Sequence, residues 1–301
     1  WYFGSFFAPG FRAKRISEEL ERLSSRGEVE LADMQQLQLD VHSTLADDLL
    51  PLLLQTWDEA GDSEELAPYR DSSGIAAVLE VLEQWDRRMA RDSTGAFVFQ
   101  VFLHRLTEGL VQDDIPLAFD FAMRLNPVFL MKFVKLALSG AYGETALLDS
   151  SPGVLLLEAA QATADWLEVE VGSPDGAGLV FGEVKVTDFD HGLGFGMPLF
   201  RAASDGGEDT VNVAQNIRWD GEAAEFVSSH VAVERTVARF SEDGTPELWV
   251  TYPIAGPADP VSAATATALE DHVEGRSRKF LFQRDEVEAA AVERIELRRP
   301  R

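Results

Sequence analysis

Apolar residues recur at helical spacing in the first sixty positions of the chain. Ile16, Leu20 and Leu23 fall at i, i+4 and i+7, so they form one apolar stripe with charged residues opposite. Gly27 follows, and glycine readily takes the left-handed conformation that ends a helix. A second stripe consists of Met34, Leu37, Val41, Leu45, Leu49 and Leu53. The pattern predicts a buried hairpin of two helices, the second of them kinked or ended at Pro51.

Helical patterning continues to about residue 168. A helix is predicted over 75–89, and Asp92 and Ser93 are capping candidates for the helix that follows. The aromatic-rich stretch 114–148 also shows helical spacing, and we interpret it as core packing. Ser151 is followed by a proline, which predicts the start of one more helix because serine caps the first turn and proline fits inside it.

Near Val169 the pattern changes from helices to short extended runs separated by turns. Runs rich in β-branched and aromatic residues lie at 178–190, 209–219, 230–240 and 247–256. Shorter elements follow, namely a helix at 263–274, a strand at 279–282, a helix capped at 283–285 and a closing strand at 294–300. The predicted fold class is α+β, with a helical part at 1–168 and a mostly β part at 169–301.

Composition excludes several classes of function. The 301 residues carry a formal net charge of −26 and contain no cysteine. Phosphate binding needs clustered Lys and Arg, so the acidic balance argues against a nucleic-acid partner. The absence of cysteine excludes disulfides, thiolate catalysis and Cys-based zinc sites. No apolar run reaches about eighteen residues, so no membrane span is predicted.

Local clusters that suggest metal or phosphate sites are better explained as ordinary structure. On a strand, Asp188 and Asp190 would share a face while His191 points the other way, and no second histidine lies at ligand spacing. The glycines at 192–196 precede no helix, so they indicate a turn and not a phosphate cradle. The histidines are scattered, at His42, His104, His191, His230 and His272. We therefore predict neither a metal site nor a cofactor site.

Arg15 is an ordinary helix cation when the pattern alone is considered. It faces Glu18 and Glu19 at i+3 and i+4, where opposite charges stabilise a helix.

Five motifs in collinear order give the chain a family resemblance. The segment at 9–20 contains an Arg-Ile helix opening, and Trp85, Asp86 and Met89 match a W-D-x-x-M segment. A Q-x-D-x-x-S-x-x-A-x-x-L-L-P pattern is matched by Gln38, Asp40, Ser43, Ala46, Leu49, Leu50 and Pro51. Further on, 181–194 keeps Gly182 and His191 of a family stretch, and 209–214 resembles a G-D-T-V-N-x-A strand. In this order the motifs resemble the later part of the β-subunit of penicillin acylases (penicillin amidases).

The resemblance implies an N-terminal-nucleophile hydrolase with an αββα sandwich, made as a secreted precursor that cuts itself. A serine outside this chain would attack an amide carbonyl, with its own α-amino group as base and an oxyanion hole that includes an asparagine. Arg15 matches the arginine that supports this asparagine, and it is the one catalytic candidate in the chain. The expected partners are the N-terminal remainder of the precursor and a small acyl-amide substrate. The expected location is periplasmic or extracellular.

Two further points follow from the comparison with the family pattern. We expect that no cofactor is required. A structural calcium ion stays open but is not supported by this chain, because the acidic calcium ligand often found before the first helix has no counterpart at 1–10. The second hypothesis for function is a non-catalytic module that keeps the fold and binds a partner, because fold does not secure function. A nucleophile at a cleavage point in a preceding segment would distinguish the enzyme from the module.

Overall fold

The computed structural model describes residues 9–111, 134, 138, 150–190, 198–215, 217–220, 225–241, 244–253 and 263–292. It combines helices with antiparallel and mixed sheets, in agreement with the α+β class. The chain divides into two compact units, which we call the larger unit (1–29 and 36–232) and the smaller unit (30–35 and 233–301).

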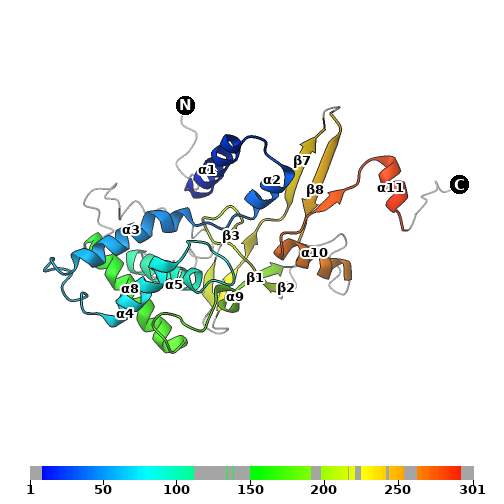
Figure 1. The fold of residues 1–301 in the computed structure, drawn as a ribbon. Coiled ribbons are helices and arrows are strands. Elements are labelled where there is room, and N and C mark those ends of the chain that lie inside the picture. Colours follow the sequence, from blue (N-terminus) through cyan, green and yellow to red (C-terminus); the bar gives the residue numbers. More distant parts are fainter. Residues whose placement is uncertain are drawn as a thin grey trace, which may run out of the picture. The chain divides into compact units, whose positions relative to one another are not determined.

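Helices dominate the first part of the chain (Figure 1). They are α1 Phe11–Arg26, α2 Leu31–Gln38, α3 Thr44–Glu59, α4 Ser73–Gln84, α5 Thr94–Val111, α8 Pro152–Glu170 and the short α9 Phe181–Val184. Ser93 and Ser151 cap α5 and α8 as predicted, since their hydroxyl oxygens accept the N–H groups of Ala96 and Val154. Val134 and Leu138 are helical and buried, whereas the rest of the predicted stretch 114–148 lies outside the described residues.

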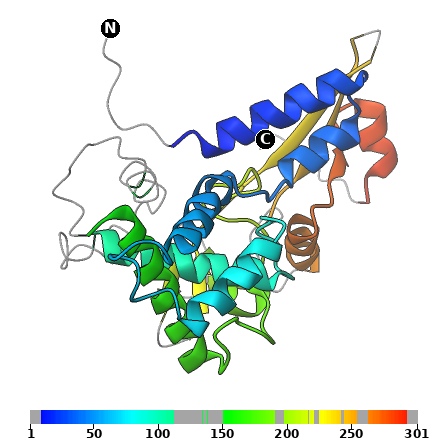
Figure 2. The same cartoon turned by 60° about the vertical axis from the view of Figure 1, so that its left-hand side comes forward.

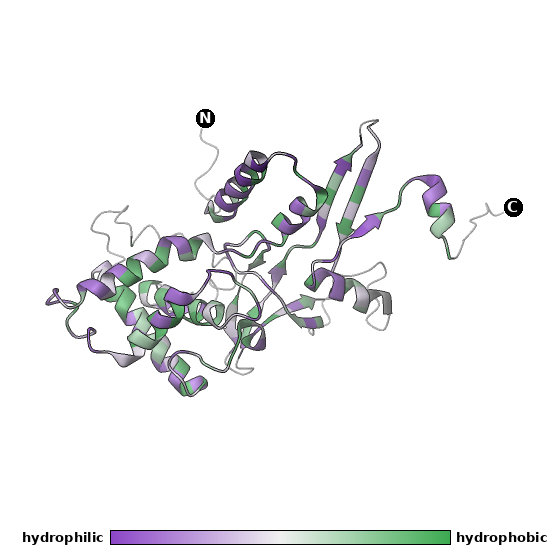
Figure 3. Ribbon diagram, in the orientation of Figure 1, coloured by the Kyte–Doolittle hydropathy of each residue, from purple (hydrophilic) through white to green (hydrophobic). Residues whose placement is uncertain are grey.

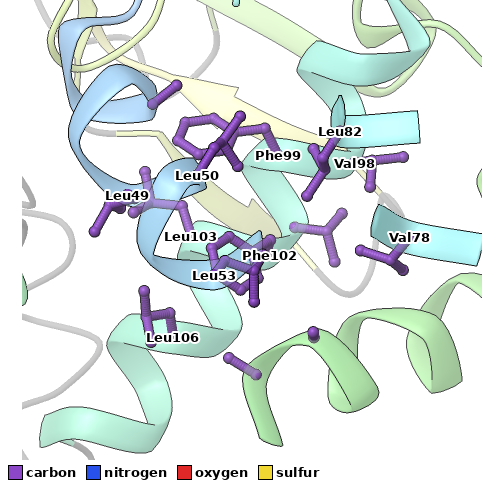
Figure 4. Packing of buried hydrophobic residues seen from close by; sticks show 14 of the residues in the cluster. Leu49, Leu50, Leu53, Val78, Leu82, Val98, Phe99, Phe102, Leu103 and Leu106 are labelled. Atoms are coloured by element: carbon purple, nitrogen blue, oxygen red, sulfur yellow. The ribbon is translucent and has the colours of Figure 1, made fainter. Parts of the chain in front are cut away.

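The core of the larger unit forms around α5. Helices α4 and α8 pack against it, α3 packs against α4 and α8, and Figure 2 shows the four gathered together. Because it is covered on several sides, α5 is apolar nearly all round, with Phe97, Phe99 and Phe102 buried. In Figure 4, Leu50 and Leu53 of α3 lie against this aromatic face.

Helix α1 is less buried than its stripe predicts. Of that stripe only Leu23 is buried, and Leu20 is 39% exposed. Figure 3 shows hydrophilic residues along most of α1. The prediction of a buried hairpin is therefore wrong for this helix, because a periodic stripe fixes which face is apolar and not whether another element covers it.

Two predicted helices are interrupted by polar turns. The second stripe is divided between α2 and α3, because the Asp40 carboxylate binds the N–H of His42 and Ser43 caps α3. The helix predicted over 75–89 ends at Gln84, where the Asp86 carboxylate binds the N–H of Arg88 in the same way. Pro51 lies inside α3 without ending it.

The larger unit also contains a four-stranded sheet with the order β2-β1-β5-β4. Its strands are β1 Lys185–Asp190, β2 Pro198–Ala203, β4 Arg218–Asp220 and β5 Glu225–Ser228. β1 is antiparallel to β2 and parallel to β5. A separate antiparallel pair consists of β3 Ala214–Gln215 and β6 His230–Val231. The strand predicted over 209–219 is mostly wrong, because 204–213 forms a loop stabilised by its own polar groups.

In its described residues the smaller unit contains a three-stranded sheet, two helices of its own and the first part of α2. Its elements are β7 Arg235–Phe240, β8 Pro246–Thr251, β9 Arg278–Phe280, α10 Ala263–Val273 and α11 Arg284–Ala290. β7 and β8, which lie in two of the predicted extended runs, form an antiparallel hairpin, closed by a hydrogen bond from the N–H of Ser241 to the carbonyl of Thr245. The predicted strand 294–300 and the glycines at 192–196 lie outside the described residues. None of the helices that are described is long and apolar enough to cross a membrane.

Candidate functional site

Arg15 lies on α1 and makes a two-pronged ion pair with Asp40. Its Nε is 3.2 Å from Asp40 Oδ1 and its Nη2 is 2.6 Å from Asp40 Oδ2. Its Nη1 is 3.1 Å from Glu19 Oε1, one helical turn away. The side chains of Arg15 and Asp40 are only 18% and 11% exposed. This geometry matches the planar fork of a guanidinium and fixes the plane of the group.

The pKa values of both partners favour the charged pair. Burial acts to lower the pKa of Arg15, but the hydrogen bond and charge of Asp40, with the charges of Glu19 and Glu18, raise it overall. Burial acts to raise the pKa of Asp40, yet the hydrogen bonds from Arg15 and from the N–H of His42 lower it. The pair therefore stays ionised throughout the neutral range.

A loop of the larger unit holds this pair from the other side. We call residues 204–213 the anchoring loop. The N–H of Asn212 donates to the carbonyl of Asp40 at 2.8 Å. Arg12, one turn before Arg15 on α1, donates from Nη2 to the carbonyl of Val211 at 3.3 Å. The anchoring loop thus binds Asp40 directly and binds the helix that carries Arg15 through Arg12.

Asp209 fixes the middle of the anchoring loop to the start of α3. Its Oδ2 accepts the Ser43 hydroxyl at 2.9 Å and the N–H of Leu45 at 2.8 Å. The residue is 4% exposed, and burial raises the pKa of its carboxyl to about 6 although both hydrogen bonds oppose the rise. A carboxylate at a helix N-terminus also meets the positive end of the helix dipole.

Lys185 supports the base of the anchoring loop from β1. The side chain is fully buried, and its Nζ donates to the carbonyl and the hydroxyl of Ser204, each at 2.9 Å. A longer contact of 3.4 Å reaches the carbonyl of Gly206. Burial lowers the pKa of Lys185 to about 7, and the charges of Asp205 and Glu208 offset only part of this.

The lowered pKa of Lys185 predicts a stability that depends on pH. Above about pH 7 the folded protein has released this proton, while an unfolded chain holds it until about pH 10. The unfolded state then binds more protons, so the free energy of unfolding rises with pH. We expect wild type to gain about 1 kcal/mol relative to Lys185→Met between pH 7 and pH 8, measured by denaturant unfolding.

The control for this experiment is Lys14→Met, which removes a lysine whose side chain is 45% exposed. Parallel stability curves for wild type and Lys185→Met over this range would contradict the prediction.

The side chains of Asp188 and His42, two of the residues considered from the sequence, have other partners. Asp188 pairs with Arg201, 2.8 Å from its Nε. His42 binds Asp47 at 2.8 Å, and the same carboxylate accepts Arg87 at 2.7 Å. Over the described ranges no group of three or more His, Asp or Glu side chains could hold a metal ion. His191 lies outside those ranges.

Sequence reasoning missed three residues of this arrangement. Asp40 was recognised as part of a motif but not as the partner of Arg15, and Asp209 was assigned to a strand. Lys185 was not singled out. For Asp40 and Asp209 the available signal is that they are carboxylates within matched motifs, since Asp side chains often bind neighbouring backbone N–H groups.

The model of the penicillin amidase family matches residues 1–289. The chain belongs to this family. The match confirms the resemblance drawn from the five motifs, and penicillin amidases hydrolyse amides. None of the curated proteins compared with the chain matches it. Both residues of the Arg15–Asp40 pair and the whole anchoring loop fall inside the matched range.

Proposed function

We propose that this chain is the C-terminal part of an amidohydrolase that removes an acyl group from an amide, using an N-terminal serine that lies outside the chain. Membership of the penicillin amidase family supports the reaction class. The observation that carries the proposal is the fixed guanidinium of Arg15, held by Asp40 through two contacts. A group that orients an oxyanion-hole donor must itself be held in place before the reaction starts.

In this mechanism the serine Oγ attacks the amide carbonyl and its own α-amino group accepts the proton. An oxyanion hole of backbone N–H groups and an asparagine amide stabilises the developing negative charge. Arg15 binds the side-chain oxygen of that asparagine, so that the amide N–H points at the oxyanion. The C–N bond then breaks, the α-ammonium group gives its proton to the leaving amine, and the acyl group stays on the serine Oγ as an ester. Water attacks this ester, its proton passes by way of the α-amino group to the serine Oγ, and the carboxylic acid is released.

The charges around Arg15 favour this directed role. A guanidinium has five N–H groups. Two of those of Arg15 donate to Asp40, and its Nη1 forms an ion pair with Glu19 at 3.1 Å, so among the described contacts N–H groups remain for an amide oxygen. Because two carboxylates offset the charge of Arg15, its contribution comes through oriented N–H groups more than through a general positive potential.

The substrate class is a small acyl amide such as a β-lactam, an acyl-homoserine lactone or an acylated peptide. The N-terminal remainder of the precursor supplies the nucleophile and completes the αββα sandwich. The periplasm or the outside of the cell is the proposed location. All of these rest on the family relationship.

The test is an intact-mass spectrum, under denaturing conditions, of the protein made from the complete gene. We expect two chains, the larger starting at Ser, Thr or Cys and ending in this sequence, and hydrolysis of at least one substrate in an acyl-amide panel. One uncut chain without amidase activity would overturn the proposal and favour the non-catalytic binding module.

A further inference from the structure

We propose that Asp209 is a positioning residue for the amidase site: its buried carboxylate holds the start of α3 and the anchoring loop together, and so keeps Asp40 and Arg15 in register. This inference rests on the proposed function and deepens it. It concerns a residue that lies outside hydrogen-bond contact with Arg15 and acts through the backbone.

On one side, Asp209 fixes the first turn of α3. The Ser43 hydroxyl donates a hydrogen bond to Asp209 Oδ2 at 2.9 Å and accepts one from the N–H of Ala46 at 3.0 Å. It is therefore engaged both as a donor and as an acceptor. The N–H of Leu45 reaches the same Oδ2 at 2.8 Å. Ser43 directly follows the turn in which Asp40 binds the N–H of His42. A displacement of the Ser43 backbone would therefore also displace the Asp40 carboxylate that binds Arg15.

On the other side, Asp209 lies three residues before the contact with Asp40. The N–H of Asn212 donates to the carbonyl of Asp40 at 2.8 Å. Thr210 makes the intervening segment rigid, since its Oγ1 accepts the N–H of Gly207 at 2.9 Å and donates to the carbonyl of Asn212 at 2.7 Å. Asp40 is therefore held at its backbone by a short, internally bonded segment that Asp209 attaches to α3.

The start of the anchoring loop is fixed independently of Asp209. Gly206 donates its N–H to the carbonyl of Met89 at 2.7 Å, and Lys185 binds the carbonyl of Ser204. The residue after the loop, Ala214, donates its N–H to the carbonyl of Gly207 at 3.1 Å. Removal of the Asp209 carboxylate should therefore loosen the middle of the loop and leave its start in place. Such a change displaces Asp40 and Arg15 slightly, and a displacement of about 1 Å in a catalytic constellation can cost up to about 10²-fold in rate.

The experiment compares Asp209→Ala with Asp209→Asn in the complete, processed enzyme. Asp209→Ala leaves the Ser43 hydroxyl and the N–H of Leu45 without their acceptor, and we expect kcat to fall about tenfold with KM little changed. Asp209→Asn keeps an oxygen that accepts both hydrogen bonds, so it should restore most of kcat. Ser43→Ala removes one of the two donors and should lower kcat by a smaller factor, which gives a second readout if Asp209→Ala fails to fold.

Ser151→Ala is the matched control. It removes the N-cap of α8 in the same unit, where the hydroxyl accepts the N–H of Val154, and it has no connection to Asp40. We expect a lower melting temperature with an unchanged kcat. Equal losses of kcat in Ser151→Ala and Asp209→Ala would show a general loss of stability and overturn the inference.

A double-mutant cycle with Arg15→Ala separates this inference from the proposed function. If Asp209 acts through Arg15, Asp209→Ala should cost clearly less than tenfold in the Arg15→Ala background. An additive cost, or normal kcat in Asp209→Ala, would overturn the inference while an active wild type upholds the proposed function. A wild type inactive toward every acyl amide would instead overturn the proposed function.

Discussion

Replacing Arg15 by alanine should cut the turnover of the complete enzyme by about 10²-fold or more, the scale of losing one oxyanion-hole element. The reason is geometric. The guanidinium is held by two hydrogen bonds to Asp40, at 2.6 and 3.2 Å, and by an ion pair with Glu19 at 3.1 Å, so its remaining N–H groups point in fixed directions. In the proposed mechanism the oxyanion-hole asparagine loses its orientation without them, and the Asp40 carboxylate loses its two-pronged partner. Steady-state kinetics on an acyl-amide substrate measures the effect.

Arg22→Ala is the control for Arg15→Ala. Arg22 lies on the same helix and pairs with the same Glu19, but its side chain is 57% exposed. We expect its turnover to stay close to that of wild type, because an exposed ion pair contributes at most about 1 kcal/mol. Arg15→Lys keeps the charge and loses the two-pronged geometry, so its turnover should lie nearer to that of Arg15→Ala than to wild type. Near-normal turnover in Arg15→Ala would remove this residue from the site.

Gly206→Ala should destabilise the larger unit by about 2–5 kcal/mol and lower turnover as well. Gly206 has a φ of +97°, and a Cβ there would lie 2.0 Å from the carbonyl oxygen of Asn212. The substitution adds the cost of a left-handed conformation, about 1–2 kcal/mol, to that of overpacking, about 1–3 kcal/mol. The blocking atom belongs to the backbone of the residue that holds Asp40, so relief of the contact displaces the ion pair. Denaturant unfolding and kinetics together measure both effects.

Gly172→Ala separates the steric contact from the conformational cost. Gly172 also has a positive φ, +81°, but no atom lies within 4 Å of the position that a Cβ would take. We expect a loss of about 1–2 kcal/mol and unchanged turnover. Equal destabilisation by the two variants would mean that the close approach to Asn212 has no energetic effect.

Local signals in the sequence identified most of the secondary structure. The caps at Ser93 and Ser151 depend on a side chain three residues from the N–H that it binds, so they can be recognised without the fold. The turn between β7 and β8 is also a local signal, since the groups that close it lie four residues apart in the sequence. The breaks before Ser43 and after Gln84 were missed because Asp40 and Asp86 compete with the helix for backbone N–H groups, and an apolar stripe runs through such turns unchanged.

Exposure was harder to predict than helicity. Leu20 fits its stripe and is nevertheless 39% exposed. Periodicity orients a helix face, whereas burial depends on whether another element arrives to cover that face. The same limit applies to 204–213, where residues with strand propensity form a loop because their polar groups bind one another and the segments around them.

The sequence by itself determined the α+β class, the change from helices to strands and the penicillin amidase family, and it offered Arg15 as the catalytic candidate. These depend on local periodicity and on the order of short motifs, and both can be recognised from the sequence without the fold. Only the tertiary structure decided how Arg15 is held. Its partner Asp40 lies 25 residues away, and Asp209 binds a serine 166 residues away. Such contacts follow from how the chain closes on itself, and a buried charge reveals its role only when its hydrogen-bond partners are known.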